Sequence, residues 1–265
     1  MFTDPLLARS PAASPAATRP PSAGGRDQAG FSLIEVAIAL ALVGFLLGSV
    51  LVPLQTRVEE NQVGTARKAL ENIRDAMIGF AAVNGYLPCP DATSGGSSND
   101  GIENFSGSFC TSINGAMVVG NVPWATLGVP ETVDPWGNRY RYAVIENYAR
   151  RSPLMFSLGT IVNGALRVCA TTACATLVIP STSDNAVAVI LSHGKNGWGA
   201  INSLTNTANT APTSADELEN SDNDKDFVYR ERTAAGTTAG EFDDVVIWLS
   251  RAVLMNRMVA AGKLP

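Results

Sequence analysis

Apolar and polar residues follow two clearly different patterns in the first 54 residues of the chain. Residues 5–30 are rich in Pro, Ala, Ser and Gly and have no apolar periodicity, so they cannot bury enough surface to offset the entropy of ordering. Residues 31–54 are almost uniformly apolar and contain one charge, Glu35. At about 1.5 Å per residue, a helix of that length spans the roughly 30 Å hydrocarbon layer. The pattern predicts a leader over residues 1–30 and a membrane-spanning helix over residues 31–54.

Beyond Pro53 the chain becomes amphipathic. Apolar residues recur at steps of three and four, at Val63, Ala66, Leu70, Ile73, Met77 and Phe80. Charged residues occupy the other face, at Arg67, Lys68, Glu71, Arg74 and Asp75. We expect one long helix whose second half covers residues 55–84 and stops at Asn84-Gly85, with Pro53 kinking it or marking its exit from the bilayer. The stripe should pack on a sheet; a coiled-coil stalk is the alternative.

Residues 85–265 predict a globular α+β domain. Turn-forming residues dominate residues 86–128, which indicates a long structured connection. Runs rich in β-forming residues follow at 139–145, 166–170, 176–179, 187–191, 227–229 and 245–249, and a short helix is expected at 251–261. Several strands after one helix predict an antiparallel sheet laid against the long N-terminal helix.

Composition and charge narrow the function classes. Hydrophobic residues make up 46% and charged residues 16% of the 265 residues, which fits one span and a polar ectodomain better than a polytopic membrane protein. The net charge of −5 and the lack of a basic cluster argue against nucleic acid as a partner. In the leader, Arg9, Arg19 and Arg26 outnumber Asp4 and Asp27. This small positive excess predicts a cytoplasmic N-terminus and an exported ectodomain.

The apolar run begins with the string Gly30-Phe31-Ser32-Leu33-Ile34-Glu35. A secretory signal peptide is the alternative explanation for the run. The run is too long for such a peptide, contains a carboxylate and is followed by no A-x-A-like site. We therefore expect cleavage before the run, between Gly30 and Phe31.

The string GFSLIE, followed by Gly44 and Pro53, resembles the N-terminus of type IV pilins and type II secretion pseudopilins. In that family a membrane peptidase cuts after the glycine and methylates the new N-terminal residue, which correspond here to Gly30 and Phe31. The resemblance implies prepilin peptidase and other pilin-like subunits as partners. It also implies a single-pass protein of the bacterial inner membrane, with a periplasmic ectodomain, that later joins a surface filament. The leader is longer than usual in the family, and the proline lies one place later.

Glu35 has a physical interpretation of its own. A carboxylate at the centre of a span costs about 2.5 kcal/mol or more, and less near an end, so such residues usually mark function. Cleavage after Gly30 would create an α-amine on Phe31 at a similar depth. The amine of one subunit could then meet the Glu35 carboxylate of its neighbour and set the axial register. The alternative is a side chain that reaches the cytoplasmic headgroups.

Four cysteines in an exported domain predict two disulfides. They are Cys89, Cys110, Cys169 and Cys174, and three pairings are open. Proximity along the chain favours Cys89 with Cys110 and Cys169 with Cys174. A zinc site is the alternative, but no C-x-x-C and no nearby histidine support it.

Three segments of the globular part resemble landmarks of major pseudopilins, in the same order. They are DPWGNRYRY at 134–142, SHGKNG at 192–197 and the pair Asp243-Asp244. In those proteins a calcium ion ties the loop near the C-terminal acidic residues, which implies a calcium site at Asp243 and Asp244. The acidic segment 216–226 is a second candidate for calcium, with a solvated loop as the alternative. An EF-hand does not fit, because Phe227 and Thr233 stand where Gly and Glu are needed.

The sequence offers no support for catalysis. Ser192 precedes the single histidine, His193, but adjacent residues in a strand point to opposite faces. We expect His193 to be a turn residue that is hydrogen-bonded to the backbone. No nucleophile elbow, Walker A loop or H-E-x-x-H is present. We expect a non-enzymatic structural subunit of a type IV pilus-like filament, with no cofactor other than calcium. A pseudopilin of a type II secretion system and a minor pilin or adhesin with a binding ectodomain are the alternatives; an anchored hydrolase would explain none of these features.

Overall fold

The computed structural model describes residues 30–93, 98–111, 113–114, 117–131, 133–151, 156–160, 166–179 and 186–264. The description does not include the side chains of residues 49–54 and 113–114. The predicted leader therefore lies outside the described residues, except for Gly30. The chain divides into two compact units, Met1–Val52 and Pro53–Pro265.

Helix α1, Leu33–Asn84, contains both predicted helical halves and continues through Pro53. It ends at the predicted stop, where Gly85 has a φ of 84°, the left-handed conformation that glycine adopts without strain. The Gly85 amide donates to the Ala81 carbonyl at 2.7 Å, which closes the last turn. Among the described residues, no helix combines the length and the apolar character needed to cross a bilayer.

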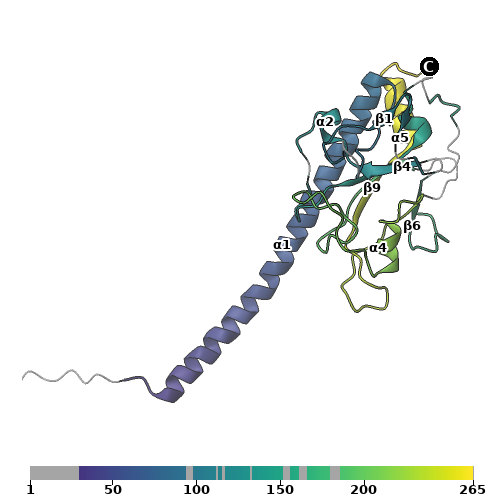
Figure 1. Ribbon diagram of the computed structural model, residues 1–265. Helices are drawn as coiled ribbons and strands as arrows, with labels where there is room; N and C mark the ends of the chain where they lie inside the picture. The colour runs from purple at the N-terminus through teal and green to yellow at the C-terminus, as the bar shows by residue number, and fades with distance from the viewer. Residues whose placement is uncertain are drawn as a thin grey trace, which may run out of the picture. The chain divides into compact units, whose positions relative to one another are not determined.

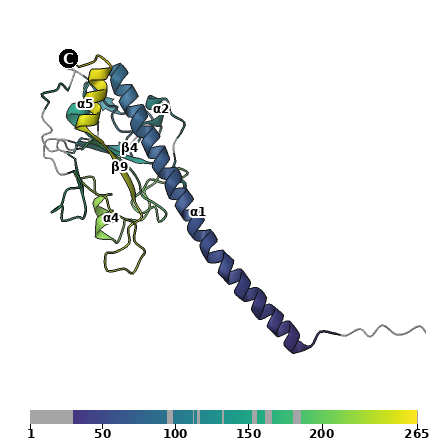
Figure 2. The same ribbon diagram turned by 180° about the vertical axis from the view of Figure 1, so that it is seen from behind.

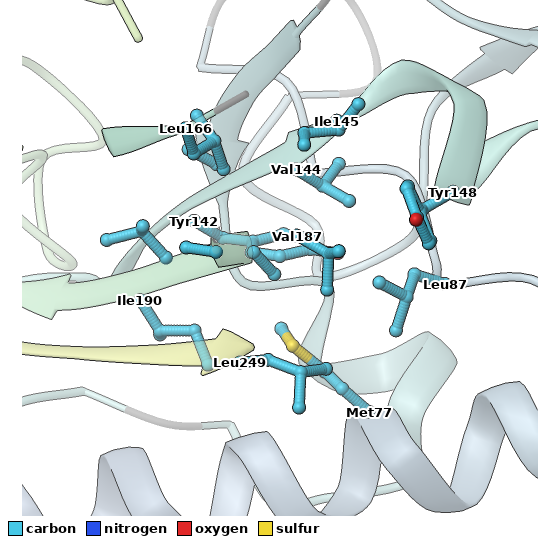
Figure 3. Packing of buried hydrophobic residues seen from close by; sticks show 14 of the residues in the cluster. Met77, Leu87, Tyr142, Val144, Ile145, Tyr148, Leu166, Val187, Ile190 and Leu249 are labelled. Carbon is cyan, nitrogen blue, oxygen red and sulfur yellow. The ribbon is translucent and has the colours of Figure 1, made fainter. Parts of the chain in front are cut away.

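The apolar stripe of α1 packs against a sheet. Leu70, Ile73 and Met77 are fully or almost fully buried in the same core as the strands of the globular unit. Arg67 and Lys68 are exposed on the other face of the helix. In Figure 3, Met77 rises from α1 toward Leu249 on a neighbouring strand. The predicted packing of this half on a sheet is confirmed, and the coiled-coil stalk is not supported.

Five strands form the main sheet, in the order β3-β4-β5-β7-β9, and every neighbouring pair is antiparallel. The strands are β3 (Ile113–Asn114), β4 (Met117–Asn121), β5 (Arg141–Ile145), β7 (Ala186–Ser192) and β9 (Val245–Ser250). Every residue of β7 is buried, because strands flank it on both sides and its apolar run, AVAVIL, suits a fully covered position. This confirms the predicted α+β class with an antiparallel sheet.

The remaining elements are short. The strands β1 (Phe105–Ser106) and β2 (Phe109–Cys110) form a hairpin, and β6 (Arg167–Cys169) pairs in parallel with β8 (Asp226–Val228). The helices are α2 (Trp124–Leu127), α3 (Glu146–Ala149), α4 (Ala215–Glu219) and α5 (Arg251–Ala260). Figures 1 and 2 show α5 beside the C-terminal end of α1 from both sides, and Lys263 Nζ, just after α5, donates to the Val83 carbonyl at 3.3 Å.

The structure corrects the predicted strands in three places. Residues 176–179 make only an isolated bridge, between Leu177 and Cys169, where a strand was expected. The connection at 86–128 contains β4, the second strand of the main sheet, which its glycines and prolines obscured in the sequence. The pairing of β6 with β8 is parallel, and local periodicity carries no information about such a distant partner.

Asp91 organises the rest of that connection. Its carboxylate is fully buried and accepts the amides of Asn99 and Gly101 at 3.0 and 2.8 Å. Its backbone pairs with Asn121 of β4, which joins the loop to the main sheet. Burial raises the pKa of Asp91 to about 6. The connection is therefore a fixed part of the globular unit, as its composition predicted.

Candidate functional site

Helix α1 begins with a reciprocal pair of side-chain hydrogen bonds. The Ser32 hydroxyl accepts the Glu35 amide at 3.2 Å, and the Glu35 carboxylate accepts the Ser32 amide at 3.4 Å. This arrangement is a capping box, in which serine and glutamate three residues apart satisfy amides that the first helical turn leaves open. The Glu35 carboxylate is thereby folded back toward the Gly30-Phe31 bond.

The residues around the predicted cleavage bond are open to solvent. Phe31 is 81% exposed, Leu33 90% and Ile34 70%. A Cβ built on Gly30 would meet no described atom within 4 Å, so no contact among the described residues requires glycine there. A requirement for glycine at this position must therefore come from outside the described chain. This is expected for a residue that a processing enzyme recognises.

Replacing Ser32 by alanine should weaken the start of α1. Loss of an N-cap side chain typically costs about 1 kcal/mol, which corresponds to a roughly fivefold faster opening of the first turn. Hydrogen exchange of the amides of residues 33–36, measured by mass spectrometry on the full chain in detergent, should rise by that factor. Ser32→Thr keeps the accepting hydroxyl and is the matched control. Equal exchange in Ser32→Ala and wild type would contradict the capping role.

Both disulfides form as proximity along the chain predicted. Cys89 pairs with Cys110 across a Cα–Cα distance of 5.5 Å, and Cys169 pairs with Cys174 at 5.0 Å. The first bridge links Cys89, near the start of the 86–128 connection, to Cys110 in strand β2, and both of these cysteines are buried. Because all four thiols are paired, the alternative of a cysteine zinc site is wrong.

The three landmark segments of the globular unit converge in space. The Asp134 carboxylate, from DPWGN, accepts the Ser192 hydroxyl at 2.7 Å and so joins the first segment to SHGKNG. The amide of Asn196 donates to the Asp243 carboxylate at 2.9 Å and joins the second segment to the acidic pair. Gly194 has a φ of 62°, and a Cβ there would overlap the Asp243 carboxylate. The glycine therefore lets the loop close over Asp243.

A third carboxylate, from Glu217 of α4, joins the acidic pair. Glu217, Asp243 and Asp244 each offer one oxygen, and these oxygens lie within 4.8 Å of one another. Glu217 accepts the Asp243 amide at 3.1 Å and the Asn196 side chain at 3.1 Å. Asp244 accepts the Asn220 side chain at 2.7 Å. The predicted pair Asp243 and Asp244 is thus part of a three-carboxylate cluster, which we call the acidic cluster.

Cations are scarce around the acidic cluster. Within the part of the chain that the structure describes, no lysine or arginine forms an ion pair with any of its three carboxylates. Burial, reinforced by the Asp244 charge, raises the pKa of Glu217 to about 7. Burial also raises the pKa of Asp243 to about 7, with Asp244 and Glu241 adding to the effect. Three carboxylates held this way attract either protons or a metal cation.

The oxygens of the acidic cluster suit calcium, which binds carboxylates preferentially. The Oδ1 atom of Asp243 is buried and has no hydrogen-bond partner among the described atoms, so it is free to coordinate an ion. Calcium at Asp243 and Asp244 therefore stays a prediction, and Glu217 becomes a further candidate ligand because its carboxylate lies beside theirs.

The acidic segment 216–226 was expected to be a solvated loop. The structure agrees with this expectation only in part. Glu217 and Asp226 are buried, and Asp226 pairs with Arg167 of β6. Asp216 accepts Arg230 Nε at 2.6 Å. The remaining acids, Glu219, Asp222 and Asp224, lie within reach of one another on a partly exposed turn. Of these three only Asp222 is exposed, and the expectation of a solvated loop is wrong for Glu217 and Asp226.

Ser192 and His193 have different neighbours, as expected for adjacent strand and turn residues. The Ser192 hydroxyl donates to Asp134, whereas His193 Nδ1 faces Asp244 Oδ1 at 3.7 Å. No hydrogen bond joins the serine to the imidazole among the described atoms. The pair therefore lacks the hydrogen bond that a nucleophile and its base require.

Residues 25–51 match the family model described as the prokaryotic N-terminal methylation motif. The chain thus carries a prepilin-type N-terminal methylation motif, and this motif supports the type IV pilin and pseudopilin family. It indicates a structural protein that a prepilin peptidase processes and that is anchored in a membrane before surface assembly. No curated protein and no solved structure matches the chain, so the comparisons leave the globular part unassigned.

Three functional residues escaped the sequence-based predictions. Ser32 had a visible signal, because serine followed three residues later by glutamate before an apolar run is a capping box. Glu217 was one of several acids in its segment, and nothing local marked it as the buried one. His193 was expected to be hydrogen-bonded to the backbone, which is wrong, because neither ring nitrogen has a hydrogen-bond partner among the described atoms. Only the tertiary structure places its ring against Asp244.

Proposed function

We propose that the chain is a non-enzymatic subunit of a type IV pilus-like filament, cleaved after Gly30, N-methylated on Phe31 and polymerised through its N-terminal helix. The observation that carries the proposal is the methylation motif at residues 25–51, which leads into an exposed helix start. The apolar run over residues 31–54 supports insertion in the inner membrane, with the globular domain in the periplasm.

The exposed apolar face of α1 supports polymerisation. Residues 33–48 are exposed along the whole described stretch, although most are apolar. Gly44 and Gly48 have no described neighbour within 4 Å of a built Cβ, so packing among the described residues does not explain glycine in this helix, where it costs about 1 kcal/mol. Small residues four apart let a second apolar helix approach closely. The helices of neighbouring subunits are the natural partners for this surface.

The Glu35 carboxylate is the group best placed to align those subunits. In the described chain it accepts only the Ser32 amide, and it lies four residues from the amine that cleavage would expose. That amine belongs to Phe31, which is 81% exposed and so accessible to a neighbour. Processing and polymerisation would then be coupled, because cleavage creates the cation that the carboxylate binds.

A pseudopilin of a type II secretion system is the second candidate. It is favoured by the convergence of DPWGN, SHGKNG and Asp243-Asp244, which resemble major pseudopilin landmarks, around one cluster. Immunogold labelling of sheared surface filaments separates the two candidates. Label along filaments supports the pilus-like subunit, and label confined to cell envelopes supports the pseudopilin.

The processing step is tested by mass spectrometry of the mature N-terminus. In the native host, the chain should begin at Phe31 and carry one methyl group on its amine. Gly30→Val should leave the precursor uncut and remove the protein from filaments, because a branched side chain replaces the glycine that precedes the cut. Gly24→Val, the same change six residues upstream and just outside the matched residues 25–51, should be processed normally. A membrane-bound wild-type chain that retains its leader would contradict the proposal.

A further inference from the structure

We propose that the open edge of strand β9 and the groove beside it bind an extended acidic segment of a partner protein, which pairs with β9 as one more strand of the main sheet. The inference goes beyond the role as a filament subunit and does not depend on it. It uses neither the processing site nor the acidic cluster.

Strand β9 is the last strand of the main sheet. One side of it pairs with β7, and the other side has no strand partner among the described residues. On that side, no other described backbone group bonds to residues 245–249. An unpaired edge presents amides and carbonyls at the spacing that a further strand needs. The outer side of β9 is therefore a template for strand addition.

The sequence of β9 lacks the features that usually protect an edge strand. Its six residues, VVIWLS, include no charge and no proline. The edge strand on the opposite side of the sheet, β3, has only two residues, and shortness is a common form of protection. Of the two edges, β9 is thus the one suited to pairing.

A groove runs along the open edge of β9. It consists of two hollows of about 290 and 470 Å³, which share Arg67, Tyr229 and Val246. The smaller hollow is lined by five consecutive residues of β9, 246–250. Consecutive side chains of a strand point to opposite faces, so an opening that touches all five lies at the edge of the strand. We call it the edge groove, and it lies where the next strand would be.

The walls of the edge groove differ in chemistry. Helix α1 forms one wall with Arg67, Glu71 and Arg74, which share a helix face. Leu249 lies toward Met77 of α1 in Figure 3, so its neighbour Trp248 points to the other face of the sheet. There the Trp248 ring meets the Tyr229 ring, with 5.3 Å between centroids. An added strand would have one face against α1 and the other beside this aromatic pair, which suits alternating acidic and apolar residues.

Arginines outnumber acids along the edge groove, although the whole chain has a net charge of −5. The lining residues with charge are Arg67, Arg74, Arg230 and Arg232 against Glu71, Glu231 and Asp244. Arg67 and Arg74 pair with exposed acids at 3.6 and 3.3 Å, and such pairs contribute little. Both guanidinium groups can therefore bind carboxylates of an incoming strand. The same positive charge disfavours the edge groove of a second copy as the occupant.

The test is calorimetric titration of the full chain in detergent with end-blocked peptides of about eight residues. We expect a peptide of alternating valine and glutamate to bind once per chain, and the same peptide with lysine for glutamate to bind at least about tenfold more weakly. A glutamate peptide with N-methylated backbone amides keeps its charge but cannot pair, and should also bind at least about tenfold more weakly. Equal binding of either control peptide, or no binding of the glutamate peptide at millimolar concentration, would overturn the proposal.

Hydrogen exchange locates the bound peptide. The amides of β9 that face away from β7 should exchange at least about fivefold more slowly at saturation, because a hydrogen bond of about 1 kcal/mol then covers each of them. A bound peptide that leaves the exchange of residues 245–249 unchanged lies elsewhere and contradicts strand addition.

Two variants of α1 test the charged wall. Arg67→Glu should weaken binding of the glutamate peptide by at least about tenfold, because a charge-assisted hydrogen bond is replaced by repulsion. Lys68→Glu, the same change at an exposed neighbour outside the edge groove, should leave binding unchanged. Equal losses in both variants would refute the role of Arg67, and a wild-type dimer that Arg67→Glu dissociates would assign the groove to a second copy instead. The peptide controls leave the chain unaltered, so they decide if a variant does not fold.

Discussion

Replacing Glu35 by alanine will leave cleavage after Gly30 intact and will abolish incorporation of the chain into filaments. The capping box shows why the side chain is available for assembly, since the carboxylate points back over the first turn and, within the described chain, accepts only the Ser32 amide. An unpaired carboxylate in the apolar span is costly, by about 2.5 kcal/mol or more at the centre of a bilayer, so an amine on the next subunit would be strongly favoured as its partner. Alanine removes the carboxylate that this amine would bind.

Glu35→Gln separates the two roles of this residue. Glutamine can still accept the Ser32 amide, because the capping box works with glutamate or glutamine, but it has no charge for an amine. We expect the variant to be processed and still absent from sheared filaments. Glu60→Ala, which removes another exposed acid of α1, should assemble normally. Wild-type amounts of Glu35→Gln in filaments would disprove the ion pair and leave capping as the function of Glu35.

Removing the Cys89–Cys110 bridge will destabilise the globular domain more than removing the Cys169–Cys174 bridge. The two bridges join cysteines 21 and 5 positions apart. On the chain-entropy account, loops of these lengths give about 3 and about 2 kcal/mol. The first bridge is also buried at both ends, so its removal leaves a gap in the core.

Double alanine variants test this order without leaving free thiols. Urea unfolding of the full chain in detergent, followed by tryptophan fluorescence, should give free energies of unfolding that fall by about 3 kcal/mol for Cys89→Ala with Cys110→Ala, and by about 2 kcal/mol for the other pair. The wild-type chain with both bridges intact is the reference. A larger loss for the Cys169 and Cys174 variant would show that the bridge in the short loop matters more than chain entropy predicts.

Local patterns were sufficient for the long helix and for most strands. The spacing of Leu70, Ile73 and Met77 predicted which face of α1 is buried, because one helical turn is 3.6 residues in any surroundings. Asn84-Gly85 predicted its end, because glycine alone adopts the left-handed conformation freely. Strand β4 was missed because its apolar residues are few and lie among turn formers, and its stability comes from pairing with β5 about twenty residues later.

The processing site could be predicted from local sequence, whereas the full acidic cluster could not. Gly30, Phe31 and Glu35 are contiguous, so the sequence by itself determined the motif, and the methylation model matches residues 25–51. The proximity of both disulfide pairs also predicted their pairing. Only the tertiary structure decided that Glu217 joins Asp243 and Asp244 and that His193 faces Asp244, since these residues come from α4 and from the ends of two strands. Burial and distance in space select among many acidic residues, and neither is encoded within a short stretch of sequence.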